Sequence, residues 1–518
     1  MFASTVALVF SSLVALLIYC YAKYGRFYAL ANRFNGPPAW PIIGNALTFV
    51  NIGADEFVRR CCEMVEKYGK TCRVWIGPEL NIIMHEPHDV EVLLSSNKLA
   101  IKSDQYRCMK CWLHDGLLLS HGCKYQQRRK LVSPTFHFRM LEDFLSCFQK
   151  HSMVLVQQLG GLCAEGRPFE LRHFLGLCML DTICDTAMGV HIQTQRNADC
   201  EYVKALESLM GIIHLRMYDL KYHFDFIFRC TSKAKEAKRA LAVINDFAEQ
   251  VILQRRNELV YAPKAKEQVH EADKQQTAGI KRRKTFLDIL LNSTINGQCL
   301  SNVDICEEVQ TFIFAGHDTL SSALMFFFYC IVTNREWERK CYEEIRSVFG
   351  TEVGAISVSR EHLNRLHYVD LCIKESLRMY PPVALIGRKA LEETKINDHI
   401  IPAGTNIGFS PLIFGRLPEV YADPNTFKPE RFEEVACENS AKLNPYTFTS
   451  FSAGPRSCLG QKYAMLQMKV TVVYILLSFN MEYVGDATQE LKLSNELTMR
   501  TKDPLMFTVR PRDVKSVN

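Results

Sequence analysis

FSAGPRSCLG, at residues 451–460, surrounds one cysteine with glycine, proline and arginine. The run that follows it, at 461–478, is apolar enough to predict a buried helix. Cys458 therefore precedes a helix N-terminus, where free backbone N–H groups and the helix dipole stabilise a thiolate. A cysteine that only fills space needs no such neighbours, so we interpret Cys458 as an anionic ligand.

The residues beside Cys458 suit a large, flat, anionic partner. Gly454 permits a tight turn, and Gly460 lets the backbone approach a bulky group closely. Arg456 is a permanent cation that suits a carboxylate, and Phe451 can shield the sulfur from water. A thiolate beside a planar dicarboxylate is what axial ligation of haem requires. The loop therefore predicts a haem-iron site with Cys458 as the metal ligand.

Composition indicates a large globular protein rather than a nucleic-acid binder or a disulfide scaffold. Of 518 residues, 48% are hydrophobic and 23% are charged, and the net charge of +6 is modest for this length. The 20 cysteines are scattered through a chain that is too long to need disulfide stapling. Cys108 and Cys111 form a C-x-x-C pair, but no second such pair completes a zinc site. We expect no nucleic-acid partner, and most cysteines as small buried hydrophobes.

The first 22 residues are expected to anchor the chain in a membrane. Residues 2–22 carry no charge, and a helix of that length crosses a hydrocarbon core of about 30 Å. A cleaved signal peptide would have a shorter apolar region after a basic segment, whereas the positive charges here follow it, at Lys23, Arg26 and Arg33. This order predicts a lumenal N-terminus and a cytosolic body, as in a single-pass protein of the endoplasmic reticulum.

The chain is predicted to have three segments: an anchor at 1–22, a basic and proline-rich hinge at 23–45, and a body at 46–518. The prolines of NGPPAWPIIGN, at 35–45, forbid helix and favour a stiff extended chain. No proline-, glycine- or serine-rich linker and no repeat divides the remainder. The body is therefore expected to fold as one unit.

Helical periodicity dominates the body and predicts a mainly α fold with small antiparallel β-sheets. Apolar residues recur at intervals of three and four near residues 57–68, 139–164, 170–187, 236–258, 302–333, 335–349 and 461–478. Short strand-like pieces lie at 72–77, 81–85, 395–409 and 505–511. The charged run at about 262–284 has almost no apolar content and is interpreted as a solvated loop.

A second motif lies in the predicted helix at 302–333. The segment EEVQTFIFAGHDTLSSA, at 307–323, has a Gly-His-Asp-Thr cluster in the middle of an apolar helix. Polar groups at such positions are costly unless they are hydrogen-bonded or functional. A Ser/Thr-rich helix that packs against its neighbours is the alternative, but no partner that would satisfy the cluster is visible in the sequence. We therefore interpret the cluster as functional.

Together the two motifs resemble those of the cytochrome P450 haem-thiolate monooxygenases. The Cys458 loop has all five fixed residues of F-x-x-G-x-R-x-C-x-G, and the resemblance runs from the hinge to the C-terminus. It implies the cytochrome P450 fold for the body, which would be the catalytic domain, and haem b as the cofactor. In the family the second motif crosses the distal haem face, where Ala315 and Gly316 would line a groove for dioxygen. Thr319 would hold bound peroxide, and Asp318 would relay protons for O–O cleavage.

The resemblance also implies which residues contact the haem. In KYQQRRK, Tyr125 stands where the family has a tryptophan, and Arg129 fits the arginine that contacts a haem propionate. Arg388 matches a further propionate arginine, although a surface position is the alternative. The full predicted set of haem contacts besides the metal ligand is Tyr125, Arg129, Ala315, Gly316, Arg388, Phe451, Arg456 and Gly460.

Two more stretches, KESLR and PERF, fit the same family. They contain Glu375, Arg378 and Arg431, which in the family form a buried ion-paired core behind the haem. Glu375 and Arg378 are three residues apart and so share one helical face. An E-x-x-R pair is common on helices, so the resemblance, and not the spacing alone, implies this core.

The helix motif indicates a branch of the family. Residues 308–320 match nine of the thirteen positions of E-V-D-T-F-M-F-E-G-H-D-T-T, which is typical of the fourth family of cytochromes P450 and its insect relatives. The differences are at Gln310, Ile313, Ala315 and Leu320. Many members have, at the position of Ala315, a glutamate that can esterify a haem methyl. Alanine has no carboxylate, so we expect haem b to be held non-covalently.

The resemblance implies a microsomal enzyme that inserts one atom of O2 into a small lipophilic substrate. Electrons are expected from NADPH through a separate NADPH-cytochrome P450 reductase, because the chain has no G-x-G-x-x-G motif of its own. Cytochrome b5 is a second candidate partner. A basic proximal face would receive these acidic partners, with Lys124, Arg128, Lys130 and Lys462 as candidates. For each of them, ordinary solvated surface is the alternative.

Two other functions stay open. A haem-thiolate isomerase or dehydratase of lipid peroxides needs neither O2 nor a reductase, although the intact Asp318–Thr319 pair argues against it. A non-catalytic haem-binding sensor or carrier would show no NADPH- and reductase-dependent O2 consumption. The substrate also stays open between fatty-acid chains and lipophilic xenobiotics, because loops set the pocket's shape.

Overall fold

The computed structural model describes residues 15, 19, 22–163, 166–197, 200–267, 285–295, 297–433 and 446–512. The predicted anchor at 1–22 lies almost entirely outside these residues, as does the part of the predicted solvated loop at 268–284. The hinge is helical at 22–31, where Arg26 pairs with Glu393 at 2.7 Å. Residues 35–39 form neither helix nor strand, as the prolines there predict.

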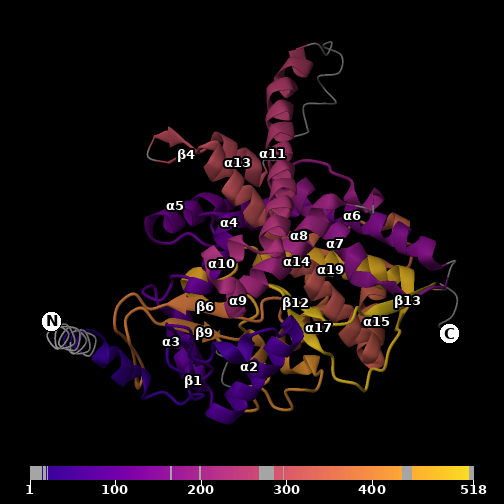
Figure 1. The fold of residues 1–518 in the computed structure, drawn as a ribbon. Helices are drawn as coiled ribbons and strands as arrows, with labels where there is room; N and C mark the ends of the chain where they lie inside the picture. The colour runs from indigo at the N-terminus through magenta and orange to yellow at the C-terminus, as the bar shows by residue number, and fades with distance from the viewer. Residues whose placement is uncertain are drawn as a thin grey trace.

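Helices make up most of the body (Figure 1). In chain order they are α2 (Ala54–Tyr68), α3 (Pro87–Ser95), α4 (Lys110–Leu113), α5 (Gly122–Val132), α6 (Phe138–Cys163), α7 (Leu171–Ile183), α8 (Glu201–Tyr218), α9 (Leu220–His223), α10 (Asp225–Arg229), α11 (Ser232–Glu267), α13 (Phe286–Asn292), α14 (Asn302–Thr333), α15 (Arg335–Phe349), α16 (Arg360–Asn364), α17 (His367–Met379), α18 (Pro411–Phe414) and α19 (Gln461–Ser478). Short 3-10 turns include η1 (Ala46–Phe49) and η9 (Gly454–Arg456).

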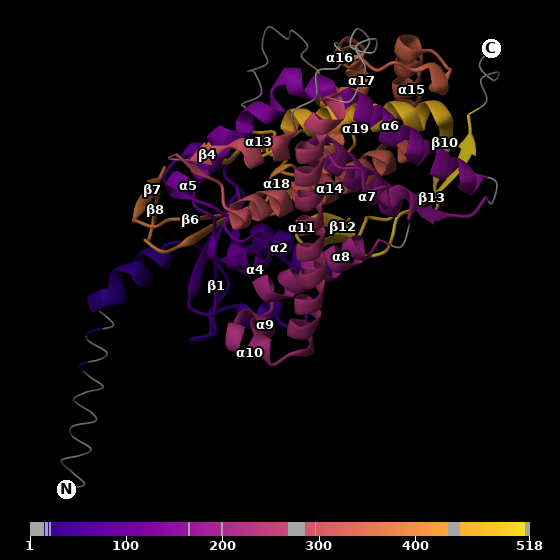
Figure 2. The same ribbon diagram turned by 90° about the horizontal axis from the view of Figure 1, so that it is seen from above.

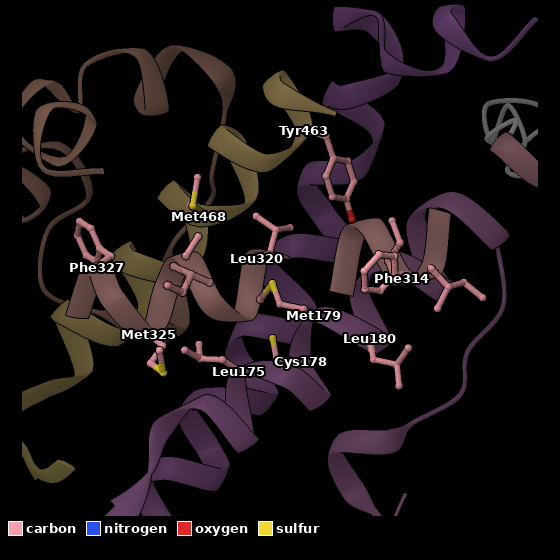
Figure 3. Close-up of a cluster of buried hydrophobic side chains, with 14 of the residues drawn as sticks. Leu175, Cys178, Met179, Leu180, Phe314, Leu320, Met325, Phe327, Tyr463 and Met468 are labelled. Atoms are coloured by element: carbon pink, nitrogen blue, oxygen red, sulfur yellow. The ribbon is translucent and has the colours of Figure 1, made fainter. Parts of the chain in front are cut away.

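Helix α14 runs through the centre of the helical part. A capping box begins it: the Ser301 hydroxyl accepts from the backbone N–H of Asp304, and the Asp304 carboxylate accepts from that of Ser301. Because α14 is apolar on most sides, it must be covered by other helices. Side chains of α7, α14 and α19 meet in one buried cluster that includes Met179, Leu320 and Met468 (Figure 3). Residues on the face of α14 that meets this cluster are therefore buried deep in the molecule.

Among the described residues, α14 is also the one helix long and apolar enough to cross a membrane. Its most apolar window is 83% buried inside the protein. This burial identifies α14 as a core helix, because a membrane span would present its apolar surface to lipid.

The strands of the main sheet lie beside α2 and α3, whereas β4 and β13 lie elsewhere on the molecule (Figure 1). The main sheet has the order β1-β2-β9-β6, formed by β1 (Thr71–Ile76), β2 (Glu79–Met84), β9 (Asn406–Phe409) and β6 (Ile386–Lys389). The other sheets are β10 (Phe479–Tyr483) with β13 (Met506–Pro511) and β3 (Phe169–Glu170), and the pairs β4 (Thr294–Ile295) with β5 (Gln298–Cys299), β7 (Thr394–Ile396) with β8 (His399–Ile401), and β11 (Leu493–Asn495) with β12 (Met499–Thr501). All pairs are antiparallel except β2–β9, where Ile82 lies opposite Ile407.

The predicted mainly α fold with small sheets is confirmed, and a helix lies at each of the seven predicted positions. Three details differ from the expectation. Helix α11 continues to Glu267, so the start of the predicted loop at 262–284 is helical. The predicted strand at 395–409 is divided into β7, β8 and β9. The pair β2–β9 is parallel, whereas only antiparallel sheets were expected. Its two strands come from distant parts of the chain and are not joined as a hairpin.

Candidate active site

The cysteine loop adopts the turn that its glycines predicted. Gly454 has a φ of +66°, and a Cβ built there would lie 2.1 Å from the Leu94 carbonyl oxygen. Only glycine fits at this position, because both the backbone conformation and the space exclude a side chain. The Cys458 N–H donates to the Phe451 carbonyl at 2.8 Å, which closes the loop just before α19 begins at Gln461.

A cavity of about 460 Å³ lies between this loop and α14. Cys458 lines it, and the surface that this residue exposes lies in the cavity rather than at the outside of the protein. The cavity brings together the predicted cofactor contacts and one of the two predicted catalytic residues. They are Tyr125, Arg129, Ala315, Gly316, Thr319, Arg388, Phe451, Arg456 and Gly460.

In the polypeptide alone, burial raises the pKa of the Cys458 thiol, and a backbone hydrogen bond from Gly460 and the charge of Arg129 act in the opposite sense. A bound metal cation is what converts a coordinating thiol into a thiolate.

Three buried cations point to an anionic guest of this cavity. Arg456 donates to backbone oxygens of Ala100 at 2.8 Å, Leu117 at 3.4 Å and Ser120. Arg388 is 2% exposed and donates only to the carbonyl of its neighbour, at 3.2 Å. The third cation is Lys102, which also lines the cavity and was missed from the sequence.

None of these three cations has a carboxylate within salt-bridge distance among the described residues. Burial lowers the pKa of each of them, and the repulsion between Lys102 and the two arginines lowers that of Lys102 further. An arginine stays charged at neutral pH even so. Uncompensated charge of this kind is costly unless a ligand supplies the counter-charge. The two carboxylates of haem fit that requirement, and Cys458 in the same cavity fits its iron.

Tyr125 and Arg129 hold the cysteine loop in place. The Tyr125 hydroxyl donates to the Pro455 carbonyl at 2.6 Å and accepts from Arg129 at 3.0 Å. Arg129 also donates to the Ser457 carbonyl at 2.9 Å. Both residues line the cavity, but their hydrogen bonds tie α5 to the loop around Cys458. Tyr125 therefore reaches the Pro455 carbonyl through its hydroxyl group. The N–H of a tryptophan indole would have to approach this carbonyl from a different position.

On the α14 side, Ala315, Gly316 and Thr319 line the cavity as predicted. A Cβ on Gly316 would lie 2.6 Å from the Ile183 side chain, so glycine allows α14 to approach the end of α7. The Thr319 hydroxyl donates to the Ala315 carbonyl at 2.6 Å. Its oxygen keeps acceptor capacity on the cavity side, and Ala315 has no group that could bond covalently to a cofactor.

Asp318, the second predicted catalytic residue, does not line the cavity. It is fully buried behind the cavity wall and accepts from Arg172 at 2.7 Å and from the hydroxyl of Thr498. Burial alone would raise the pKa of Asp318, but Arg172 and Arg500 hold it below its usual range. Of its contacts, Thr498 lines the cavity, so this hydroxyl connects Asp318 to the cavity. Sequence reasoning missed all three partners, since they lie far from Asp318 in the chain.

The ion-paired core that the resemblance implied is present. Glu375 accepts two hydrogen bonds from Arg378, at 2.7 and 2.8 Å, and one from Arg431 at 3.0 Å. Glu375 and Arg378 are almost completely buried. Since each charge is paired, this group forms part of the core and leaves no free charge for a ligand.

Of the four candidate residues for a basic proximal face, Arg128 was wrongly assigned and Lys124 is half-exposed and paired. Arg128 is 3% exposed and pairs with Asp304, and Lys124 pairs with Glu307 at 2.8 Å. Both acids belong to the first turns of α14, against which α5 packs. Lys130 and Lys462 are exposed.

The pair Cys108 and Cys111 does not line the cavity. Burial raises the pKa of both thiols, that of Cys108 to about 11, and the Cys111 thiol donates to the Cys108 carbonyl at 3.3 Å. Within the described ranges no group of three histidine, cysteine or acidic side chains could hold a metal ion. A haem iron needs only one such ligand from the protein, so the prediction for Cys458 does not require a cluster of this kind.

A cysteine just before a helix N-terminus, on a cavity wall that also carries cations without a protein carboxylate, is the arrangement expected of the class of haem-thiolate proteins. Comparison with known proteins gives the family. The sequence profile described as Cytochrome P450 matches residues 34–509. Cytochrome P450 4d1 of Drosophila melanogaster is 47% identical over 503 residues, covering 96% of this chain and 97% of that protein. Cytochrome P450 4d10 of Drosophila mettleri is 44% identical over 487 residues, covering 94% and 93%.

The chain therefore belongs to the cytochrome P450 family. The predicted similarity to the fourth family and its insect relatives is confirmed by these Drosophila proteins. Membership implies a haem-iron cofactor and the activity of an oxygenase, in agreement with the geometry of the cavity.

Proposed function

We propose that this protein is a haem-thiolate monooxygenase that inserts one atom of O2 into a small lipophilic substrate, with electrons from NADPH through a separate reductase. The observation that carries the proposal is the presence of Cys458, the unpaired cations and Thr319 on the wall of one cavity. Haem bound there supplies an iron that activates dioxygen. The residues of the chain bind, orient and shield that group and move protons.

Cys458 would provide the sulfur ligand of the haem iron, and Arg388, Arg456 and Lys102 would hold the haem propionates. These contacts are supported by the absence of any carboxylate partner for the three cations among the described residues. Phe451 lines the cavity beside the sulfur and excludes water from it. Haem b is held without a covalent bond, since Ala315 has no carboxylate. Acid and organic solvent should extract it completely.

Thr319 holds a proton at its Oγ1 on the substrate side of the cofactor. Its position on the cavity wall supports this role. Asp318 relays protons toward this site: when its carboxylate turns away from Arg172, it takes up a proton from solvent water and passes it on. Its contact with the Thr498 hydroxyl, which borders the cavity, supports such a route. General acids positioned in this way typically contribute about 10²–10⁴ in rate.

The electron-transfer partners are NADPH-cytochrome P450 reductase and, as a second donor, cytochrome b5. Lys130, near the end of α5, and Lys462, near the start of α19, are both exposed. They offer cations to these acidic proteins. The substrate is a fatty-acid chain or a lipophilic xenobiotic. The many apolar residues on the cavity wall, such as Phe57, Met64 and Met217, support a lipophilic molecule.

The protein resides in the endoplasmic reticulum membrane with a single N-terminal anchor and a cytosolic catalytic domain. Exposed apolar side chains on two neighbouring segments support contact with lipid. Trp40 and Ile42 precede η1, and Phe226 lies on α10, directly after α9, which packs against η1 (Figure 2). Ile42 is 90% exposed and Phe226 is 72% exposed. Membrane lipid is therefore a partner of the body as well as of the anchor.

The experiment that tests the proposal uses Cys458→Ser. Thiolate ligation gives the reduced carbonyl complex a strongly red-shifted Soret band, and the wild-type protein should show it. The variant should lose the band and most of its haem, because the other cysteines of the cavity wall, Cys61, Cys62 and Cys72, lie on α2 and β1 and not in the cysteine loop. Wild-type protein with reductase and NADPH should also consume O2 in proportion to product. A thiolate-type spectrum in Cys458→Ser, or O2 uptake without product on any lipophile, would refute the proposal.

A further inference from the structure

Four charged side chains from four segments form a node behind the cavity wall, in which Asp318 is fully buried and Glu207 is partly exposed. Arg172 of α7 donates to Asp318 of α14 at 2.7 Å and to Glu207 of α8 at 3.0 Å. Arg500 of β12 repeats this bridge, at 3.5 Å to Asp318 and 3.8 Å to Glu207. Arg500 also pairs with Glu496 at 3.3 Å, so each cation of the node has acid partners within the chain. The node therefore connects α7, α8 and α14 to the hairpin formed by β11 and β12.

The hairpin of β11 and β12 is fastened to α14 by two further hydrogen bonds beside the node. The Thr498 hydroxyl donates to Asp318, and the Ser322 hydroxyl donates to the Met499 carbonyl at 2.6 Å. The backbone N–H of Met499 in turn donates to the Pro382 carbonyl at 2.8 Å. All these contacts fall within three consecutive hairpin residues, 498–500. The contacts of the hairpin with α14 are therefore concentrated at the start of β12, while β11 packs against α2.

The turn of this hairpin forms part of the cavity wall. Asn495, Leu497 and Thr498 all line the cavity that contains Cys458. Leu497 has a φ of +112°, a conformation that a residue with a side chain rarely adopts. Such strain persists only where the surrounding contacts over-determine the backbone, and it is concentrated at ligand sites. Here the contacts at 498–500 are the ones that hold Leu497 in place.

We propose that Asp318 is a positioning residue, which through Thr498 and Arg500 holds the turn at Leu497 against the substrate cavity and so sets which molecular shapes bind there. Leu497 is the residue that selects, and the charged node fixes its location. This proposal rests on the proposed function only in that the cavity binds haem and a lipophile. It adds a role for Asp318 in the selection of ligands by shape, and this role is separate from proton transfer.

A proton-transfer role for Asp318 and a positioning role predict different results. Loss of a proton donor changes peroxide release and the solvent isotope effect but leaves ligand affinities intact. Loss of a positioning contact changes which ligands fit and increases the mobility of residues 493–501. Measurements of ligand binding and backbone exchange on the haem-loaded protein therefore decide the question without any turnover.

The first measurement is hydrogen exchange of the full-length holoprotein, read on peptides that cover residues 493–501. Asp318→Asn and Arg500→Met should each speed exchange there about tenfold, because they remove a buried charge contact. Lys502→Met is the matched control, since it removes an exposed ion pair, 2.8 Å to Asp55, at the end of the same hairpin. The control should exchange as the wild type does. Equal exchange in all four proteins would overturn the proposal.

The second measurement compares two ligands of different shape, 1-dodecylimidazole and 4-phenylimidazole, by their Soret shifts. The ratio of their dissociation constants should change at least about threefold in Leu497→Ala, because the cavity loses a branched side chain. Asp318→Asn should change the ratio in the same direction. An unchanged ratio in Asp318→Asn, with a changed ratio in Leu497→Ala, would overturn the positioning role.

Thr498→Val keeps the test decisive if Asp318→Asn does not fold. It removes only the hydroxyl that Asp318 accepts from and should reproduce the changed ligand ratio. Thr498→Ser retains the hydroxyl and should restore the wild-type ratio, which a purely steric effect of residue 498 would not do. A protein that binds both imidazoles but never oxygenates a lipophile would contradict the proposed function and leave this result standing. Failure of Thr498→Ser to differ from Thr498→Val would refute the role of the hydroxyl contact.

Discussion

The protein contains two buried groups of cations that differ in how their charge is balanced. At the cysteine loop, Arg388, Arg456 and Lys102 have no carboxylate within salt-bridge distance among the described residues. Behind the α14 wall, Arg172 and Arg500 share two acids, Asp318 and Glu207. Both groups are within reach of the same cavity, yet only the first needs a charge from outside the chain.

This difference distinguishes a ligand-binding site from a structural ion-pair cluster. A buried arginine cannot lose its proton, so a nearby anion is needed to offset the free-energy cost of its desolvation. Where the chain supplies the anion, the contact fixes one element against another. Where the chain supplies none, the cations are preorganised for a guest, and the guest here is a dicarboxylate. Buried arginine alone is therefore no sign of a ligand site, and the missing acid is the informative part.

The largest effect is expected from breaking the balanced group. Arg172→Met leaves Asp318 and Glu207 with one cation fewer in a buried place and should lower the free energy of unfolding by about 3–5 kcal/mol. Urea unfolding of the holoprotein, followed by circular dichroism, measures this. Arg360→Met is the control, since its pair with Glu142 is exposed and should be worth less than about 1 kcal/mol. Similar losses in the two variants would contradict the distinction between the groups.

A buried acid that can neutralise itself should behave differently from an arginine. Glu308 is fully buried and accepts from the Leu117 N–H at 3.1 Å, and burial raises its pKa to about 7. The folded protein therefore binds a proton more tightly than the unfolded chain, so the stability of the wild type falls as pH rises from about 4.5 to 7. Glu308→Gln resembles the protonated acid and avoids this loss.

The variant Glu308→Gln should match the wild type in stability near pH 5 and exceed it at pH 8 by on the order of 3 kcal/mol. Urea unfolding at the two pH values measures the difference. If Glu308→Gln were instead less stable than the wild type at pH 8, Glu308 would be held as a carboxylate. A difference that does not depend on pH would mean that packing, and not the proton, distinguishes the two side chains.

Removing a cation from the unbalanced group should weaken haem binding and leave the fold intact. Arg388→Met and Lys102→Met should each speed haem transfer to apomyoglobin about tenfold, because a charge-assisted contact to a propionate is lost. Lys102→Arg keeps the charge and should retain haem as the wild type does. The unfolding free energy should change far less than in Arg172→Met. Unchanged haem transfer in Lys102→Met would remove this lysine from the cofactor site.

Local spacing was enough to predict much of the site. The cysteine loop and the polar cluster of α14 each lie within a few consecutive residues, so their relation is fixed by turn or helix geometry. The Glu375–Arg378 pair shares one helical face, but the family resemblance was needed to predict its burial. Arg388 was predictable only through its family resemblance. Its burial depends on the contact of β6 with β9, which no local pattern reveals.

The remaining site residues depend on contacts between distant segments. Arg172 and Thr498 meet Asp318 across 146 and 180 residues. Lys102 faces the same cavity from a loop with no motif of its own. The error at Arg128 has the same origin: its charge looked solvent-exposed, but α5 packs on α14 beside Asp304. A sequence specifies which charges exist, whereas packing decides which of them are paired.

The smallest expected effect concerns Leu497, whose strained backbone the balanced group holds in place. Glycine is ordinarily less stabilising than alanine by about 0.5–1 kcal/mol. At a φ of +112° the order should reverse, and Leu497→Gly should be more stable than Leu497→Ala by about 1 kcal/mol. The Gly and Ala variants lose the same leucine contacts, so their difference isolates the backbone. Arg339→Ala and Arg339→Gly, on the exposed side of α15, should show the ordinary order.

Combining this pair with Asp318→Asn tests whether the node is what maintains the strain. If Asp318 forces the turn at 497 into its position, releasing that contact lets the turn relax, and the advantage of Leu497→Gly over Leu497→Ala should shrink toward zero. If the advantage persists, the turn keeps its conformation through the β11–β12 pairing alone, in which Asn495 lies opposite Met499. The balanced charges would then be bystanders to the cavity wall, and their contrast with the cations at the cysteine loop would concern stability only.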